Sequence, residues 1–344
     1  MSTENTNSVA FHLSANTSPE VRDKFLDHGR FPADIAQRGL DLVLTHKGSF
    51  QAGGSGLVVR GDDLIPVPMT ELDIPALYTR LVPPVNAVPG DIKRLNPNEL
   101  KQFASSKERV MSVVPDDLKI ESHYVDARNF DDARRIVEEM DHVERFVVKS
   151  DRGFGGMSVH AVDRAGLAEY VDTLIGTDSS QRLIVQQQIS YGSLPESIQG
   201  YGECGEDEKV KRVRQDGTPS ELRIFIAHFG GRTTYVPVLR VFDGETRNGI
   251  APSGDVYVDV EVSDTLISQL SEQTSSIVSA AAKEAGAPNY YLAAVDWFYD
   301  DTGRWRVMEA NLRSPTPPRT RDNPKAGRAV HEAIADTLAY MAER

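Results

Sequence analysis

The sequence has little cysteine and no long apolar segment. Its 344 residues contain a single cysteine, Cys204. One cysteine can form neither an internal disulfide nor a thiolate zinc site, so nothing in the sequence requires an oxidising compartment. No window approaches the roughly 20 apolar residues that a membrane-spanning helix needs, and residues 1–8 lack the apolar stretch of a secretory signal. We therefore expect a cytoplasmic protein that does not interact with membranes.

Positive charge is also scarce. The chain has 38 Lys and Arg against 51 Asp and Glu, a formal net charge of −13 at pH 7. This acid excess argues against nucleic acid as a partner of the surface at large. The eight histidines form no HExxH or other close pair, so a histidine-built metal centre is not expected. The remaining composition, 40% hydrophobic and 26% charged, is that of a globular protein with two or three domains.

The first unit that the pattern predicts is residues 1–97. A short helix at 31–39 leads into an apolar strand at 40–45, which is typical of an α/β domain. The glycine-rich stretch 47–63 is expected to form a hairpin or loop over that sheet.

Two further units are predicted after residue 97. Residues 98–182 combine helices with a strand at 145–149 and a following glycine loop, which indicates a compact α+β domain. Residues 183–344 hold most of the later strands and a long helix at 263–286. The polar, glycine-containing stretch 190–220 within this unit is expected to be a flexible excursion.

One literal motif match is dismissed. Residues 200–205 read GxGxxG, but a dinucleotide fingerprint needs a strand before it and a helix after it, and here a polar stretch and a charge run flank it. No GxxxxGK[ST] motif occurs, so a Walker-type phosphate loop is absent from the sequence.

A stronger candidate is the segment VVKSDRGFGGMSV. Lys149 ends an apolar strand and can present a fixed positive charge to a phosphate. The loop that follows has glycines without a Cβ atom, which lets backbone N–H groups approach a phosphate chain: Gly153, Gly155 and Gly156. The pattern is typical either of a nucleotide lid or of a glycine hairpin with an exposed lysine.

A third candidate lies near the C-terminus. Asp296 sits within the apolar strand AAVDWF, where a carboxylate is costly unless it is paired or bound to a metal. Glu309 and Asn311 point to the same face of the next strand because side chains alternate along a strand. Three hard oxygen ligands suit Mg²⁺ bridging phosphates. The alternative is a hairpin with its polar face in solvent.

These two sites, with an apolar strand ending in QQQI between them, have the order found in ATP-grasp enzymes. The chain resembles a prokaryotic glutathione synthetase-type ATP-grasp ligase. The resemblance rests on three stretches, 147–159, 238–255 (VLRVFDGETRNGIAPSGD) and 293–318 (AAVDWFYDDTGRWRVMEANLRSPTPP), and more weakly on 30–44. It implies an α/β (α+β) ATP-grasp fold: an N-terminal α/β pre-ATP-grasp domain, a small α+β lid domain and a C-terminal α+β domain with an antiparallel sheet.

The resemblance also implies roles for particular residues. It assigns ATP phosphates to Lys107 and Lys149, the adenine hinge to Gln186, Gln187 and Ile189, and the ribose to Glu221, with Arg223 in the matching Glu-x-Arg position. It assigns Mg²⁺, for which Mn²⁺ can substitute, to Asp296, Glu309 and Asn311. Arg240 is expected at the transferred phosphate, so that the catalytic set is Arg240, Lys149 and Asn311. Substrate carboxylate recognition is expected at Arg313 and Ser314, with Arg319 and Arg321 following.

Each of these roles has a structural alternative. Lys107 lies in the charged run Lys-Glu-Arg, which is also typical of a solvated helix face. The glutamine run can be an edge strand. Glu221 and Arg223 lie two apart on one strand face and can pair with each other, and Arg313 can lie in a solvated loop.

The activity implied by the resemblance is an ATP-dependent carboxylate–amine ligase, ADP-forming, that acts through an acyl-phosphate on amino acids or peptides and assembles as a homo-oligomer. The diluted match before residue 97 and the long stretch 190–220 leave its particular substrates open. Two alternatives stay open as well: an ATP-grasp small-molecule kinase and a non-catalytic ATP-binding regulatory protein.

Overall fold

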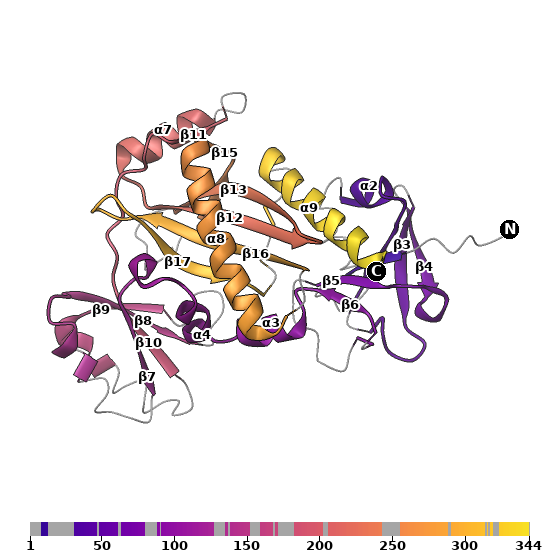
Figure 1. The fold of residues 1–344 in the computed structure, drawn as a ribbon, viewed down its shortest axis with the longest axis horizontal. Helices are drawn as coiled ribbons and strands as arrows, with labels where there is room; N and C mark the ends of the chain where they lie inside the picture. The colour runs from indigo at the N-terminus through magenta and orange to yellow at the C-terminus, as the bar shows by residue number, and fades with distance from the viewer. Residues whose placement is uncertain are drawn as a thin grey trace.

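The computed structural model of the protein describes residues 8–12, 31–46, 48–60, 63–79, 88–89, 91–126, 135–136, 138–151, 159–167, 169–170, 182–201, 206–242, 255–287, 290–313, 315, 317–318 and 323–343. Three sheets of four or more strands organise these residues (Figure 1).

The first sheet has six strands in the order β4-β3-β2-β1-β5-β6. Its strands are β1 (Ser8–His12), β2 (Asp41–Thr45), β3 (Ser55–Arg60), β4 (Asp63–Pro68), β5 (Ala76–Thr79) and β6 (Lys93–Leu95). Four of them, β2-β1-β5-β6, run parallel, with helix α2 (Phe31–Ala36) between β1 and β2 in the chain. The other two form an antiparallel hairpin at one edge. The expected α/β opening is therefore present. The glycine-rich stretch contributes β3, which extends the sheet at this edge instead of lying over it as a hairpin or loop.

The second sheet is antiparallel, with the order β7-β10-β8-β9. Its strands are β7 (Ser122–Asp126), β8 (Arg145–Ser150), β9 (Val159–Asp163) and β10 (Arg182–Gln187). The short helices α3 (Asn98–Phe103) and α4 (Lys107–Ser112) and a 3₁₀ turn, η3 (Asp116–Leu118), precede it. Because β10 belongs to this sheet, the sheet extends past the boundary predicted at residue 182. The boundaries at 97 and 182 stay predictions.

The third sheet is antiparallel, with the order β14-β13-β12-β16-β17. Its strands are β12 (Ser220–Phe229), β13 (Arg232–Phe242), β14 (Asp255–Val258), β16 (Tyr290–Tyr299) and β17 (Trp305–Asn311). Two long helices accompany it, α8 (Asp264–Ala285) and α9 (Pro324–Ala342). As the sequence predicts, α8 ends at Gly286, whose positive φ of 66° suits a residue without a side chain.

The expectation of a flexible excursion at 190–220 is wrong for its described residues. Strand β11 (Ile198–Gly200) pairs with β15 (Val260–Val262), and helix α7 (Glu206–Asp216) follows. The α7 side chain of Arg214 donates to the carbonyl oxygens of Leu194, Pro195 and Ile198. These bonds anchor a strongly charged helix to the segment before it.

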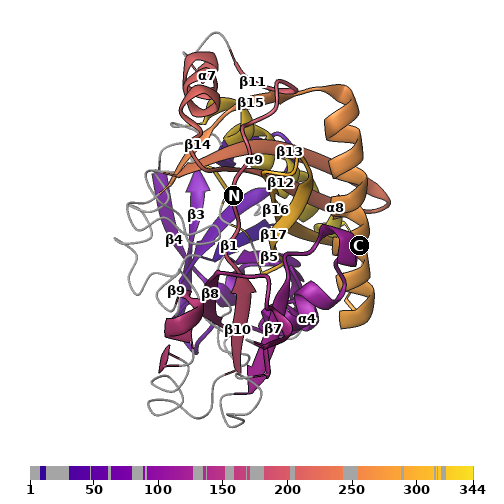
Figure 2. The same ribbon diagram turned by 90° about the vertical axis from the view of Figure 1, so that its left-hand side faces the viewer.

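The two faces of the third sheet are covered by different helices, and this positions the site. One face packs on α8 through Leu222, Ile224, Val295 and Trp297. The opposite face packs on α9 and the first sheet through Phe225, Ala227, Val238, Leu292 and Ala294. Figures 1 and 2 show α8 and α9 on either side of this sheet. Because side chains alternate along a strand, the face that packs on α9 also bears polar side chains farther along the same strands.

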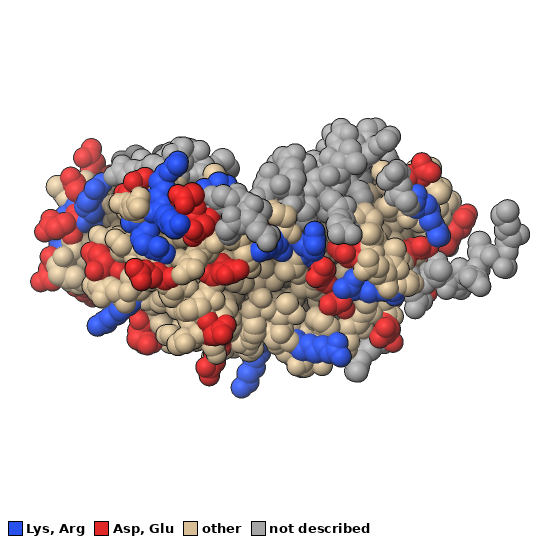
Figure 3. All heavy atoms as spheres, turned by 90° about the horizontal axis from the view of Figure 1, so that it is seen from above, with Lys and Arg blue, Asp and Glu red and all other residues tan. Residues whose placement is uncertain are grey.

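The surface carries charges of both signs. On the face shown in Figure 3, blue and red side chains are interspersed among the described residues. None of the helices in the described part of the chain combines the length and apolar character needed to cross a bilayer.

Candidate active site

A row of polar side chains crosses the third sheet from β13 to β17. Residues directly opposite each other in an antiparallel pair point to the same face. Arg240 lies opposite Glu221, and Arg223 lies opposite Asp296. Asp296 in turn lies opposite Glu309, beside an irregularity in register between Asp296 and Trp297. The sheet therefore brings predicted residues 80 or more positions apart onto one face, the face that α9 covers farther along the strands.

The centre of the row is a buried ion pair between Arg223 and Asp296. Nε of Arg223 donates to Oδ1 of Asp296 at 2.5 Å, and Nη2 donates to Oδ2 at 2.7 Å. Arg223 also donates to the hydroxyl of Tyr257 at 2.6 Å, and Nδ2 of Asn311 donates to Oδ2 of Asp296 at 3.1 Å. Asp296 is 0% exposed. Its burial within an apolar strand is thus compensated by a two-point ion pair.

A second ion pair lies next to the first. Oε2 of Glu221 accepts from Nη1 of Arg240 at 3.4 Å, and Oε1 accepts from the hydroxyl of Tyr191 at 3.0 Å. Burial, together with the nearby Asp296 carboxylate, raises the pKa of Glu221, and Arg240 offsets this only in part. Glu221 and Arg223 therefore pair with Arg240 and Asp296 on neighbouring strands rather than with each other, because the register of the sheet places these residues directly opposite.

Lys149 approaches this row from the second sheet. Its Nζ donates to Oε1 of Gln186 at 3.1 Å, and Nε2 of Gln186 donates to the hydroxyl of Ser122 at 3.0 Å. Desolvation lowers the pKa of Lys149 to about 8, while the carboxylates of Glu309 and Glu221 act in the opposite direction. Lys149 is thus close enough to the third sheet for its carboxylates to act on it, and Gln186 orients its amine.

Lys107 is held at the end of the same strand. Its Nζ donates to the carbonyl oxygens of Ser150 and Asp151, at 3.4 and 3.5 Å. The Asp151 carboxylate also accepts from the Ser106 hydroxyl and from the backbone N–H of Glu108, which fixes the start of α4. Lys107 is therefore directed at the β8 turn, and its charge acts on Lys149.

The three residues predicted as magnesium ligands are neighbours on β16 and β17. Among the described residues, no cluster of three Asp, Glu, His or Cys side chains could hold a metal ion. A cation here would have two carboxylates and an amide oxygen. The Glu309 side chain makes no hydrogen bond or ion pair with another described residue, and the amide nitrogen of Asn311 donates to Asp296, which leaves the Asn311 side-chain oxygen as an acceptor. These hard oxygen donors fit Mg²⁺.

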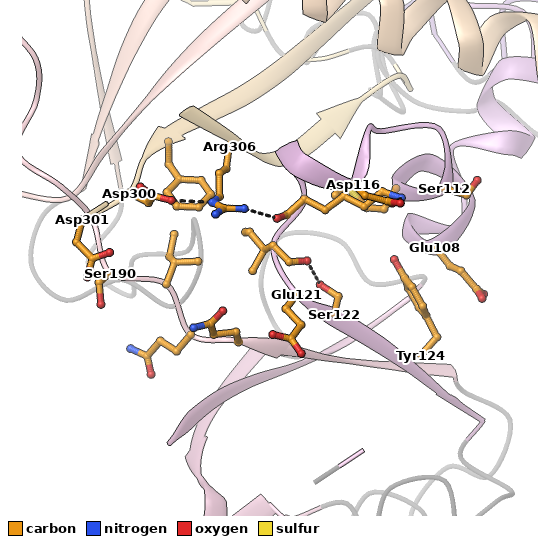
Figure 4. Close-up of a pocket in the computed structure, with 17 residues that line it drawn as sticks. Glu108, Ser112, Asp116, Glu121, Ser122, Tyr124, Ser190, Asp300, Asp301 and Arg306 are labelled. Carbon is orange, nitrogen blue, oxygen red and sulfur yellow. Dashed lines mark hydrogen bonds and ion pairs between the residues drawn. The ribbon is translucent and has the colours of Figure 1, made fainter. Parts of the chain in front are cut away.

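A cavity of about 750 Å³ adjoins the predicted hinge (Figure 4). Gln187, Gln188 and Ile189 line it on one side, and Phe298 lines it from the third sheet. The backbone N–H groups of Gln187 and Gln188 donate to the carbonyl oxygens of Glu121 and Arg145, so both are used within the protein. Lys149, Glu221 and the predicted metal ligands do not line this cavity. It therefore borders the hinge without containing the charged row.

Some predicted residues cannot be placed. Gly153, Gly155, Gly156, Ser314, Arg319, Arg321 and Cys204 lie outside the described residues, as does the GETRNG segment. Arg313 is described. It follows β17, and burial lowers its pKa.

Sequence reasoning missed several residues at the site. The Tyr191 hydroxyl donates to Glu221, and the Tyr257 hydroxyl accepts from Arg223. The Ser122 hydroxyl accepts from Gln186. Arg306, which donates to Asp300 at 2.7 Å, lines the cavity. Nothing in the local sequence marks the two tyrosines or Ser122, because their partners lie 30 or more positions away in the chain. Arg306 differs, since Asp300 lies six positions before it around the turn between β16 and β17.

Comparisons with known proteins relate the chain to others by structure alone. No protein-family model matches it, and no curated protein matches it in sequence. Among solved structures, it is similar to D-alanyl-alanine synthetase A from Vibrio cholerae, at 13% identity and a TM-score of 0.55, over 97% of this chain and 99% of that one.

Two other solved structures are similar to the chain over nearly its whole length. The D-cycloserine synthetase DcsG is 14% identical with a TM-score of 0.57, over 96% of this chain and 100% of that one. An ATP-grasp RimK domain protein from Sphaerobacter thermophilus is 14% identical with a TM-score of 0.55, over 96% of this chain and 98% of that one. At these identities the likeness shows the fold, and the ATP-grasp fold expected from the sequence is confirmed.

Proposed function

We propose that this ATP-grasp protein is an ATP-dependent ligase that joins a carboxylate to an amine through an acyl-phosphate. The observation that carries the proposal is the row Arg240, Glu221, Arg223, Asp296 and Glu309 on one face of the third sheet, with Lys149 directed toward it from the second sheet. Alternating cations and carboxylates at a junction of two sheets suit a metal-bound polyphosphate. The structural neighbours, which are named as ligases and synthetases, support this class.

The nucleotide has a place in this arrangement. Lys107 and Lys149 bind its phosphate oxygens, since their two positive charges lie close together at the end of β8. Glu221 binds the ribose, and Gln186, Gln187 and Ile189 bind the adenine. Glu309, Asn311 and Asp296 would hold Mg²⁺, which would neutralise phosphate charge.

The chain's own residues position and stabilise the reacting groups. A carboxylate oxygen of the substrate forms a bond to the γ-phosphorus, and the bond to the β-phosphate oxygen breaks, releasing ADP. The amine nitrogen then bonds to the acyl carbon while phosphate leaves, and the nitrogen loses a proton. Arg240 is placed to stabilise negative charge on the transferred phosphate. No side chain acts as a covalent nucleophile.

The proposal extends to the substrates, the assembly and the domains of the protein. We propose amino acids or short peptides as substrates, as in glutathione synthetase-like ligases, a homo-oligomer as the assembly, and the three domains 1–97, 98–182 and 183–344. A small-molecule kinase with this fold would form a phosphorylated product without an amine, and an ATP-binding regulator with this fold would form no product. ADP release that requires an amine separates the ligase from both.

The test is a matrix of carboxylates and amines in which ADP release is measured and products are identified by mass spectrometry. Lys149→Met and Glu309→Gln are expected to lower kcat by a factor of about 100 or more, because the first removes a positive charge beside the transferred phosphate and the second removes a proposed ligand of the Mg²⁺ that would neutralise it. Lys209→Met, at an exposed position of α7, is the control and is expected to match the wild type. Wild-type turnover in either site variant would refute the site, and amine-independent ADP release would refute the ligase.

A further inference from the structure

Lys101 is a buried lysine that the catalytic row does not use. It lies on α3 and is 2% exposed. Its Nζ has no hydrogen-bond partner among the residues that the structure describes. An ammonium group without a partner is one of the most costly groups to bury, and proteins normally pair such charges. The position therefore needs an explanation beyond packing.

The surroundings of Lys101 add positive charge instead of removing it. Burial, together with the guanidinium groups of Arg94 and Arg313, lowers its pKa to about 7. Burial also lowers the pKa of His12 to about 4, and the charges of His46 and Lys101 act in the same direction. No carboxylate of the described residues offsets either shift. The cluster thus holds the cations Lys101, Arg94 and Arg313 beside His12, whose low pKa keeps it neutral near pH 7, and no described carboxylate acts on Lys101.

Other hydrogen bonds hold the members of this cluster in place. Arg94, which is 8% exposed, donates to the carbonyl oxygen of Val88 and to the side chain of Asn98. His12 pairs with the Thr45 hydroxyl at 3.0 Å. Glu99 is near enough to Arg94 to favour its charged form. Lys101 is the member of the cluster whose side-chain nitrogen has no hydrogen-bond partner among the described residues.

The location of the cluster connects it to the catalytic row. His12 and Thr45 end the parallel strands β1 and β2, and ligands bind at the carboxyl ends of strands in open α/β sheets. Arg313 comes two residues after Asn311 on the segment that leaves β17. A molecule held by Lys101 and Arg313 therefore lies next to the residues proposed to hold the metal and the transferred phosphate.

We propose that Lys101, flanked by His12, Arg94 and Arg313, binds a carboxylate of the substrate other than the one that reacts. The acid substrate is then a dicarboxylate, or a peptide that presents a second carboxylate, and not a simple zwitterionic amino acid, whose ammonium group would face cations. This inference rests on the proposed function for its reacting carboxylate, while the binding of the second carboxylate is measured independently of turnover.

The experiment compares succinate with β-alanine and propionate. Succinate and β-alanine differ only in carrying a carboxylate or an ammonium at the far end, and propionate carries neither. Binding to the full-length protein is measured by calorimetry, with and without Mg²⁺ and a non-hydrolysable ATP analogue. We expect succinate to bind at least ten times more tightly than either comparison compound.

Two variants identify the residue responsible. Lys101→Met is expected to bind succinate at least ten times more weakly and to bind propionate unchanged, whereas the exposed control Lys209→Met keeps the wild-type preference. The melting temperature of Lys101→Met without ligand is expected to equal or exceed that of the wild type, since an unpaired buried charge has been removed. Lys101→Gln, which keeps a polar group, gives the same loss of preference and serves if the methionine variant fails to fold.

Three results would overturn the inference: no succinate binding, equal binding of β-alanine and succinate, or wild-type succinate affinity in both Lys101 variants. A lysine with a purely structural role would instead lower the melting temperature of the variants without changing succinate affinity. Failure of the proposed function has a different signature, because it shows as absent nucleotide binding or absent ADP release while succinate still binds.

Discussion

The Arg223–Asp296 pair makes a quantitative prediction about the third sheet. Replacing Arg223 by methionine keeps much of the side-chain volume but leaves the Asp296 carboxylate buried without its cation. Asp296 is 0% exposed and accepts two hydrogen bonds from Arg223, at 2.5 and 2.7 Å. Removing one partner of a buried ion pair costs about 3 to 5 kcal/mol, because the remaining charge is desolvated and uncompensated. The Asn311 amide is the remaining donor in the described residues, so we expect a loss of about 4 kcal/mol.

The tryptophan content of the chain supplies a local assay. The chain has two tryptophans, Trp297 and Trp305, and both lie in the β16–β17 hairpin. Trp297 directly follows Asp296 and is fully buried. Urea unfolding followed by tryptophan fluorescence therefore reports the sheet that carries the ion pair. Arg304→Met, at an exposed arginine of the same hairpin, is the matched control and is expected to change the unfolding free energy by less than about 0.5 kcal/mol.

A double variant separates the ion pair from packing. Arg223→Met combined with Asp296→Leu leaves no unpaired charge, so its loss of stability is expected to be smaller than that of Arg223→Met alone. Mg²⁺ provides a second comparison. It should stabilise Arg223→Met more than the wild type, since the freed Asp296 carboxylate lies beside Glu309. A loss below about 1 kcal/mol in Arg223→Met, or additive losses in the double variant, would show that the pair does not hold this sheet together.

Two further perturbations test other parts of the structure with the same unfolding assay. The pKa of His12 is lowered to about 4 from an ordinary value of 6.5, so the unfolded chain binds a proton first as pH falls; stability is expected to decrease by about 3 kcal/mol between pH 6.5 and 4, and His12→Asn should remove that decrease. An unchanged pH profile in His12→Asn would contradict the assignment. Gly192→Ala places a Cβ atom 2.3 Å from the Asp300 carbonyl oxygen and should destabilise by about 1 to 3 kcal/mol, whereas Ser193→Ala, at the exposed neighbouring position, should have little effect. Wild-type stability of Gly192→Ala would show that the backbone crossing there is not tight.

The elements of the candidate site were predictable where a local pattern decides the outcome. The alternation of β17 places Glu309 and Asn311 together, and the apolar setting of Asp296 predicts a partner for it. The identity of that partner was not predictable. Glu221 and Arg223 lie on one strand face and suggest a pair with each other, but the register of three strands gives each a different partner. Only the sheet order, which is a long-range property, decides between these pairings.

The error at α7 and the surprise at Lys101 have related causes. The sequence of α7, EDEKVKRVRQD, is so polar that composition favours a flexible segment. Its helix is supported by Asp207–Lys211 pairing on its surface and by Arg214 at the carbonyl groups of residues 194–198. Lys101 lies in NELKQF, which is typical of a surface helix, yet the folded chain buries it. Burial of single polar residues is set by contacts that no local window contains.

The two kinds of cation in and around the site follow different rules. Arg223 and Arg240 pair with carboxylates of the protein, where a planar guanidinium can satisfy two acceptors at once. Lys149 has a neutral glutamine as its hydrogen-bond partner, and the Lys101 amine has none within the described part of the chain. Both lysines have pKa values lowered by burial, to about 8 and about 7, and an anion beside either one would favour its charged form. Buried charge that the protein leaves unmatched is available to a ligand. On this reasoning the arginines stabilise the polar row of the sheet by pairing with its carboxylates. The lysines bind ligands instead: Lys149 binds the phosphates, and Lys101 binds a second carboxylate of the substrate.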